Sequence, residues 1–177
     1  DRTGNEIIPM LYESTFYDSK GYFSIKKGGL TSILDRDGKT LIPFHYEDVL
    51  YYQILDYGYC KVKSGGKWGV MDRSGKEIVP CRYDDANSWQ FEDSDYCTVV
   101  RDGKKGVVDK SGKEIIPCRY DDINTYALDE TDYCTATLHG KKGLVSKSGE
   151  EVLPFEYDAV GMVSNGDYVT VNQGGSI

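Results

Sequence analysis

The chain alternates short runs of apolar and aromatic residues with glycine-containing turns, a pattern typical of antiparallel β-structure. The clearest example is Tyr96–Arg101, which is rich in aromatic and β-branched residues and is predicted to be a strand. Asp102-Gly103 is a strong hairpin signal, so Lys105–Asp109 is predicted to pair with it as the second strand. A second glycine turn, Asp109–Lys113, leads into a third run, Glu114–Tyr120. The pattern therefore predicts a three-stranded antiparallel meander.

Helical signals are weak throughout the sequence. No segment keeps an apolar residue at every 3.6th position over several turns, so we expect no long helix. From Asp121 to Asp132 the pattern predicts an irregular connection, with at most a short helical turn. Each third strand contains a proline, which cannot donate a ladder hydrogen bond, so we expect Pro80 and Pro117 at a strand end, a bulge or an unpaired edge.

The meander is repeated along the chain. A motif of the form Gly-x-x-apolar-apolar-Pro occurs five times, with its prolines 34, 37, 37 and 37 residues apart. Three residues after each proline stands a tyrosine followed by an acid, as in Tyr83-Asp84 and Tyr120-Asp121. A second tyrosine series opens each unit and contributes to the 15 tyrosines. A fixed period of this size predicts stacked repeats, each burying its apolar face against its neighbours.

We therefore expect an all-β protein in which residues 1–177 form a single open repeat array. The predicted units are approximately 1–21 (partial), 22–58, 59–95, 96–132, 133–167 and 168–177 (partial). Asp1 falls in register with Asp35, so the sequence opens inside a unit, and we expect a fragment of a longer array. The alternative is a small propeller-like ring, closed by pairing Tyr168–Asn172 near Glu6–Pro9.

One unit carries a nameable signature. The segment Gly66–Pro80, which reads GKWGVMDRSGKEIVP, resembles the bacterial WG (KWG) repeat family of tandem β-rich repeats. The position of Trp68 is Lys105 and Lys142 in the next two units. The resemblance implies a repeat scaffold with no established general activity, and a bacterial source by analogy, in the cytoplasm or at the cell surface. The positions that we assign to the repeat structure are Trp68, Pro80, Tyr83, Asp84, Pro117, Tyr120 and Asp121.

Charge limits the partners. The net charge of −8 argues against nucleic acid, because phosphate binding needs a basic surface. No apolar run is long enough to insert into a membrane. Asp84–Asp95 and Asp121–Asp132 hold five acids each and no base, whereas Arg101–Lys113 holds five bases and two acids. Either neighbouring units attract one another weakly, or an acidic stripe recognises a basic partner or another copy of the chain.

The five cysteines follow the same period. They form two series, Cys60, Cys97 and Cys134, and Cys81 and Cys118. None of the close spacings that a zinc site needs is present, so no metal is expected. We interpret the cysteines as buried apolar side chains, because Phe44 and Phe155 stand where Cys81 and Cys118 stand. Disulfides between Cys81 and Cys97, or between Cys60 and Cys81, are the alternative.

The sequence contains no complete motif of a known catalytic site. The two histidines, His45 and His139, lie in different units, so a Ser-His-Asp set would need to assemble by coincidence. Asp35–Gly38 resembles the start of a calcium loop but lacks the glutamate at position twelve, so we interpret it as a hairpin turn. We predict no enzyme, no catalytic residue and no cofactor. An enzyme site would need an irregular unit, and the first, with Gly28–Ser32 and its shortened spacing, is the largest departure.

Repeats build surfaces, so we predict a non-catalytic scaffold for protein–protein recognition or self-assembly. The connections between units place aromatic residues beside acids. The candidate partner-binding surface is Trp89, Phe91, Tyr126, Asp93, Asp95, Asp129 and Glu130. A glycan- or peptide-binding module and an accessory domain of an enzyme are the alternatives.

Overall fold

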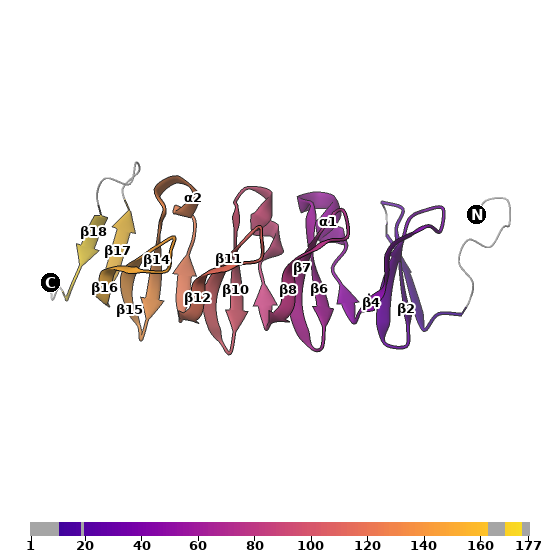
Figure 1. Ribbon diagram of the computed structural model, residues 1–177, viewed down its shortest axis with the longest axis horizontal. Helices are drawn as coiled ribbons and strands as arrows, with labels where there is room; N and C mark the ends of the chain where they lie inside the picture. The colour runs from indigo at the N-terminus through magenta and orange to yellow at the C-terminus, as the bar shows by residue number, and fades with distance from the viewer. Residues whose placement is uncertain (1–10, 19, 163–168, 175–177) are drawn as a thin grey trace.

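The computed structural model describes residues 11–18, 20–162 and 169–174. Figure 1 shows an elongated row of small antiparallel sheets that follow one another along the long axis in chain order. We name them sheets A to E. In each of sheets A to D, four strands pair as an antiparallel meander, and sheet E has two strands.

The strands have the following limits. Sheet A contains β1 (Ser14–Tyr17), β2 (Phe23–Lys27), β3 (Leu30–Leu34) and β4 (Thr40–Tyr46). Sheet B contains β5 (Asp48–Val49), β6 (Tyr59–Ser64), β7 (Lys67–Asp72) and β8 (Glu77–Tyr83). Sheet C contains β9 (Asp85–Ala86), β10 (Tyr96–Arg101), β11 (Lys104–Asp109) and β12 (Glu114–Tyr120). Sheet D contains β13 (Asp122–Asn124), β14 (Tyr133–Leu138), β15 (Lys141–Ser146) and β16 (Glu151–Tyr157). Sheet E contains β17 (Ala159–Met162) and β18 (Val169–Asn172).

Short helices lie in the connections between the first and second strands of sheets B, C and D. They are α1 (Tyr52–Tyr57), the 3-10 helix η1 (Ser88–Glu92) and α2 (Leu128–Thr131). The expectation of at most a short helical turn at this point is therefore confirmed. None of the helices in the described part of the chain is long and apolar enough to cross a membrane.

The last three strands of each full sheet are the predicted meander, and a short first strand joins them. In sheet C this is β9, which begins directly after Asp84 and pairs with β10 through Ala86 and Val99. In sheet D, β13 does the same through Ile123 and Ala136. Part of the connection expected to be irregular is therefore a strand, and each sheet begins about ten residues before the opening tyrosine of a predicted unit.

Two features of the repeat motif have local causes. Pro80 and Pro117 lie in β8 and β12, which are edge strands of their sheets, in agreement with the prediction for proline. The glycine that follows Trp68 in the signature, and Gly106 in the next unit, lie beside a shift in strand register. A Cβ at Gly106 would stand 2.7 Å from the Ile116 carbonyl oxygen, so the third strand approaches too closely for any side chain.

The hydrophobic core is divided among the junctions between adjacent sheets. At the B/C junction, Val70, Val79 and Tyr83 of sheet B pack against residues of sheet C that include Phe91 and Val99. The C/D junction buries Tyr96, Val107, Ile116, Tyr120, Ile123, Leu128, Cys134, Ala136 and Val145. The A/B junction buries Ile33, Ile42, Tyr46, Val49, Tyr51, Cys60, Val62 and Met71. Each sheet is thus stabilised by its nearest neighbours, as expected of a stacked array.

All five cysteines carry free thiols, so neither alternative disulfide is formed. Cys60, Cys97 and Cys134 are buried in the junctions. Burial raises the pKa of the Cys60 thiol to about 12, which keeps it neutral. The interpretation of these three cysteines as small apolar core residues is confirmed, and Cys81 and Cys118 are half-buried.

The described sheets form an open array with no closure among them (Figure 1). Of the predicted closing pair, Glu6–Pro9 and Tyr168 lie outside the described residues, as does the first copy of the repeat motif. The rest of the second segment, Val169–Asn172, is β18 and pairs with β17.

The residues that the shorter first repeat lacks are missing from a different segment than the one expected. Only five residues separate β1 from β2, whereas nine, including α1, separate β5 from β6. The segment Gly28–Ser32 is regular, with Gly28 and Gly29 turning from β2 into β3. The departure therefore lies in the connection before β2, and the Gly28–Ser32 segment has the same hairpin as the other units.

Candidate functional site

Three exposed aromatic residues occupy equivalent positions in successive connections. Tyr52, Trp89 and Tyr126 are one 37-residue period apart, and their exposed fractions are 52%, 52% and 93%. Figure 1 shows α1 and α2 along the same edge of the row of sheets. We call these three residues the aromatic ladder. Trp89 and Tyr126 were predicted from the sequence as surface residues and Tyr52 was not, although the 37-residue period identifies Tyr52 as their equivalent.

A groove of about 570 Å³ lies between the connection of sheet C and the connection of sheet D. Its walls contain Asn87, Trp89, Gln90, Glu92, Asp93 and Ser94 from the connection of sheet C, Thr125, Tyr126 and Asp129 from that of sheet D, and Ile123 and Asn124 from β13. Thr98, Lys105 and Asp122 complete its lining. We call this hollow the C/D groove.

The C/D groove follows from two differences between repeats. The residues one period before Thr98 and Lys105 are Lys61 and Trp68. At the B/C junction, the Lys61 ammonium lies 4.7 Å from the centre of the Trp68 ring and forms an ion pair with Asp85. At the C/D junction the small Thr98 replaces the lysine, and a lysine replaces the large indole. The lost side-chain volume at the second junction accounts for the open space.

Hydrogen bonds brace the two connections around the groove. The Gln90 side-chain oxygen accepts a hydrogen bond of 2.7 Å from the Thr98 backbone N–H, and its amide nitrogen donates to the Thr125 hydroxyl at 3.4 Å. One period earlier, the Gln53 oxygen accepts from the Lys61 N–H at 3.1 Å and from the Ser88 hydroxyl at 3.0 Å. These hydrogen bonds hold each connection against its own sheet and against the connection of the next sheet. The backbone that carries the aromatic ladder is therefore fixed in position.

Four of the predicted surface residues come together in the groove. Trp89, Asp93, Tyr126 and Asp129 all line it, while Glu130 is exposed on α2 outside the lining. Asp95 does not line the groove and makes contacts within the chain. Its carboxylate forms a 3.2 Å ion pair with Lys110, and its backbone N–H donates to Asp129 at 3.2 Å.

The assignment of Phe91 to the surface is wrong. Its exposed fraction is 1%, and its ring centre lies 5.4 Å from that of Tyr59 within the B/C core. Trp89 and Phe91 both lie on η1, which has about three residues per turn, so residues two apart point to different sides. Trp89 therefore faces solvent while Phe91 faces the core.

The groove carries an excess of negative charge. Its lining includes the carboxylates of Glu92, Asp93, Asp122 and Asp129 and one ammonium group, that of Lys105. Lys105 binds Asp122 at 2.6 Å and lowers the pKa of that carboxyl group below its usual value, which keeps the pair charged. Three negative groups remain, and they favour a cationic ligand.

The aspartate of the Tyr-Asp step has a structural role. Asp84 forms an ion pair with Lys67 of sheet B and accepts a 2.6 Å hydrogen bond from the Asp102 N–H, in a hairpin turn of sheet C. It therefore ties two neighbouring sheets, and these contacts lower its pKa. The corresponding ion pairs at the next two junctions are Lys104–Asp121 and Lys141–Asp158. Much of the predicted acidic and basic patterning is thus paired within the molecule.

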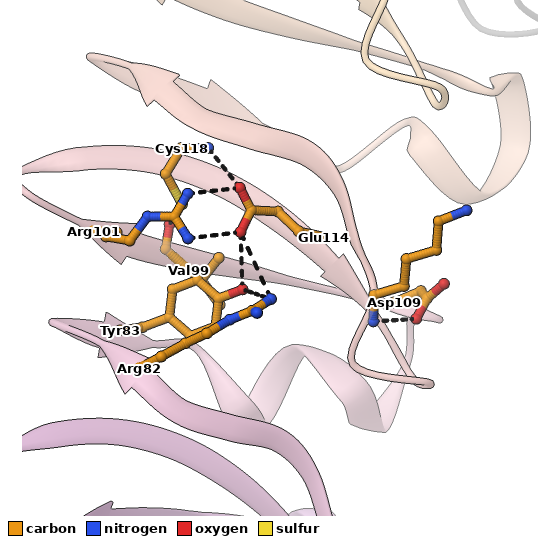
Figure 2. Close-up of polar contacts among 8 residues, drawn as sticks. Arg82, Tyr83, Val99, Arg101, Asp109, Glu114 and Cys118 are labelled. Atoms are coloured by element: carbon orange, nitrogen blue, oxygen red, sulfur yellow. Dashed lines mark hydrogen bonds and ion pairs between the residues drawn. The ribbon is translucent and has the colours of Figure 1, made fainter. Parts of the chain in front are cut away.

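The tyrosine of the same step belongs to a polar cluster at the B/C junction (Figure 2). The Tyr83 hydroxyl donates to Glu114 at 3.1 Å and accepts from Arg82 at 2.8 Å. Arg101 donates two hydrogen bonds to the Glu114 carboxylate, at 3.0 and 2.9 Å, and the Cys118 N–H donates a third at 3.3 Å. Each polar group has a partner in the cluster, so we interpret it as a structural brace.

Burial and hydrogen bonding oppose each other at Glu114. Burial is the largest single influence on its pKa and raises it, but the bonds from Arg101, Cys118 and Tyr83 together hold the pKa below its usual value. Burial raises the pKa of Tyr83 to about 12. At neutral pH the cluster therefore contains a carboxylate and a neutral phenol.

The other motifs considered in the sequence are turns or isolated side chains. His45 packs edge-on against Tyr46 in sheet A, and His139 lies in a hairpin turn of sheet D. The Asp35 carboxylate accepts hydrogen bonds from the backbone N–H groups of Asp37 and Lys39, at 3.0 and 2.9 Å. The calcium-like segment is therefore a hairpin turn, as predicted.

Two solved structures are similar to the chain over most of its length. A structure described as the crystal structure of the eukaryotic initiation factor matches 96% of this chain and 52% of its own chain, at 11% identity and a TM-score of 0.43. The structure of Kluyveromyces lactis Hsv2p matches 79% of this chain and 50% of its own, at 11% identity and a TM-score of 0.37. The chain thus spans about half the length of these proteins, and scores this low carry no functional argument.

No curated protein matches the chain. The sequence profile of the WG containing repeat, in contrast, matches residues 1–30, 33–68, 68–104, 106–129 and 143–176. These five matches follow the repeats along nearly the whole chain, including units in which lysine replaces the signature tryptophan. The chain belongs to the WG-containing repeat family.

Proposed function

We propose that this chain is a non-catalytic recognition array that binds a protein partner along its aromatic ladder and C/D groove. The observation that carries the proposal is the exposure of Trp89 and Tyr126 on the two walls of one groove. Large, rigid aromatic side chains with a polar atom dominate many protein interfaces. The groove volume of about 570 Å³ also falls in the range of about 300–1,000 Å³ common for binding pockets.

A separate partner is favoured over self-assembly. Assembly through complementary stripes would require lysines and aspartates that are available to another copy of the chain. Lys67, Lys104 and Lys141 are instead paired with aspartates of the adjacent sheet. Light scattering across protein concentration, at low and high salt, tests this choice. We expect a constant monomer mass, and a mass that grows at low salt would favour self-assembly.

The proposed surface is tested by comparing immobilised variants for capture of proteins from an extract of the source organism. We expect Trp89→Ala with Tyr126→Ala to reduce capture of the principal partner at least tenfold, because aromatic anchors each contribute more than about 1 kcal/mol. Val152→Ala is the matched control, since Val152 is exposed on β16 outside the groove lining. Equal capture by all three proteins would reject the aromatic ladder as the partner surface.

A glycan is the second candidate, supported by one further observation. Asn87, Gln90 and Asn124 contribute side-chain amides to the lining of the groove. Amides can bind sugar hydroxyl groups while an aromatic ring stacks on a sugar face. Titration with cellohexaose, followed by tryptophan fluorescence, tests this candidate. Binding that is insensitive to salt and lost in Trp89→Ala would favour the glycan over the protein partner.

A further inference from the structure

We propose that the C/D groove receives a long cationic side chain, from a lysine or an arginine, that projects from an extended segment of the partner protein. This inference rests on the proposed recognition function and specifies the chemistry of the ligand. Three independent observations support it: the occupant of the equivalent space at the neighbouring junction, the charge of the lining, and the position of the aromatic rings.

The neighbouring junction shows what this space can hold. At the B/C junction, Lys61 lies against the Trp68 ring, and its side chain is only 16% exposed. Thr98 occupies the position of Lys61 in the next repeat and cannot fill the same volume. A lysine or arginine from another protein supplies the missing hydrocarbon stem. Its terminal charge would meet Glu92, Asp93 and Asp129, because Asp122, the equivalent of Asp85, is already paired with Lys105.

The groove charge selects a cation. None of Glu92, Asp93 and Asp129 forms an ion pair within the described residues. The one lysine in the lining, Lys105, is already paired with Asp122. An incoming ammonium or guanidinium group therefore meets three carboxylates with no internal competitor, whereas an anionic ligand would be repelled.

The aromatic rings complete the site. Trp89 and Tyr126 line the groove from two different connections, and both are exposed enough for a ligand to reach them. A cation within about 6 Å of such a ring is attracted by its electron-rich face, and indole is the strongest of the aromatic groups. Arginine also stacks its planar guanidinium on these rings. This pair of walls explains why the aromatic ladder and the acidic residues occur in the same connections.

The test uses two matched peptides and one pair of groove variants. The probes are fluorescein-labelled (Gly-Arg)₄ and (Gly-citrulline)₄, which differ in charge but hardly in shape, and fluorescence polarisation reports binding at about 25 mM salt. We expect the arginine peptide to bind at least tenfold more tightly than the citrulline peptide. Equal binding of the two peptides would overturn the proposal.

The groove itself is tested by filling it. The double variant Thr98→Lys, Lys105→Trp places the two floor residues of the B/C junction in the C/D groove, and its net charge equals that of the original chain. We expect it to weaken arginine-peptide binding at least tenfold. An unchanged affinity would mean that the peptide binds the general negative field of the protein, and would overturn the proposal.

A further variant tests the groove without changing its packing, in case the variant with the filled groove does not fold. Asp93→Asn with Asp129→Asn removes two exposed charges without changing side-chain size, and we expect about a fivefold to tenfold loss of arginine-peptide affinity. Retained affinity here would also overturn the proposal. Binding of cellohexaose in the groove, with no binding of the arginine peptide, would replace it with the glycan.

The failures of the two proposals are distinguishable. Loss of the captured partner in the Trp89, Tyr126 double variant, without arginine-peptide binding to the original chain, would reject the cationic ligand and leave the recognition surface in place. Full capture by that double variant would reject the recognition surface itself.

Discussion

The B/C and C/D junctions are built from equivalent strands, yet at one Lys61 packs on the Trp68 ring and at the other the equivalent positions line the C/D groove. Both have an aspartate that ties the sheets, a buried tyrosine, and a short helix in the connection. They differ at the two floor positions, which are Lys61 and Trp68 in one and Thr98 and Lys105 in the other. The ties between sheets and the groove thus use different positions of one repeat, so a junction can contain a groove and keep its ties.

The largest effect is expected from the buried aromatic of the B/C connection. Phe91→Ala should lower the free energy of unfolding by about 3–5 kcal/mol, because it removes a fully buried ring and leaves a cavity. Leu128→Ala, the equivalent change at the C/D junction, should cost about 2–5 kcal/mol. Urea denaturation followed by circular dichroism measures both. A cost below about 1 kcal/mol for either would show that the connection does not hold its junction together.

A matched pair of glycines sharpens the comparison of junctions. Gly75 and Gly112 occupy equivalent turns with φ of +83° and +80°, so alanine strains the backbone equally at both. A Cβ at Gly112 would collide with the Ile78 carbonyl oxygen of the preceding sheet, whereas nothing lies within 4 Å at Gly75. Gly112→Ala should therefore destabilise the chain by about 1–3 kcal/mol more than Gly75→Ala, measured by thermal and urea unfolding. Equal costs would mean that the turn does not touch the neighbouring sheet in solution.

Glu114 should give a pH-dependent difference. Its hydrogen bonds lower its pKa in the folded chain below the unfolded value of about 4.3, so the stabilisation is present above that pH and is lost as the pH falls through the folded-state pKa. Glu114→Gln should cost about 1 kcal/mol at pH 7, a value reduced by the partial exposure of Arg101, and the cost should shrink below about pH 4.

The control for Glu114 is Glu151→Gln, because Glu151 is the equivalent residue of sheet D and is exposed. Stability curves from pH 3 to 8 should separate the two variants only at the higher pH values. A constant cost for Glu114→Gln across this range would argue against the ionised carboxylate as the source of stability.

The smallest effect on stability is expected at the aromatic ladder. Trp89→Ala with Tyr126→Ala should change the free energy of unfolding by less than about 0.5 kcal/mol, because neither side chain is part of the buried core. Urea titration of the double variant beside Phe91→Ala measures the contrast within one connection. A cost comparable to that of Phe91→Ala would place Trp89 in the structural part of the repeat.

The sequence contains most of the fold because its signals are local and repeated. Alternation, hairpin turns and the 37-residue period are sufficient to predict the meander, the stacking and the burial of Tyr83 and Tyr120. The short strand β9 was missed because two residues give no period-two signal. Phe91 was misplaced because the orientation of adjacent aromatics depends on the pitch of a five-residue 3-10 helix, which hydrophobicity does not reveal.

The candidate site was only partly accessible from sequence. Trp89, Tyr126, Asp93 and Asp129 could be identified as aromatics and acids within the connections. The groove itself depends on residues from two strands. At the B/C junction the equivalent space is occupied by Lys61 of β6, which lies over the Trp68 ring of β7. The replacement of Trp68 by Lys105 was visible in the sequence as a departure from the family signature. Its consequence needed the strand register, because only that register makes Thr98 and Lys105 diagonal neighbours on one face of the sheet, through the pairs Thr98–Val107 and Val100–Lys105.

The aspartate ties also determine how the array responds to mechanical load. Asp84 and Asp121 each fasten a hairpin of one sheet to a lysine of the sheet before it, and the same tie recurs at Asp158. A chain stretched by its ends would thus meet one set of ties for every 37 residues, and each set that breaks would release about 120–130 Å of extended chain. An array of this kind would lengthen in steps under tension, because one sheet could unfold while the remaining sheets stay folded.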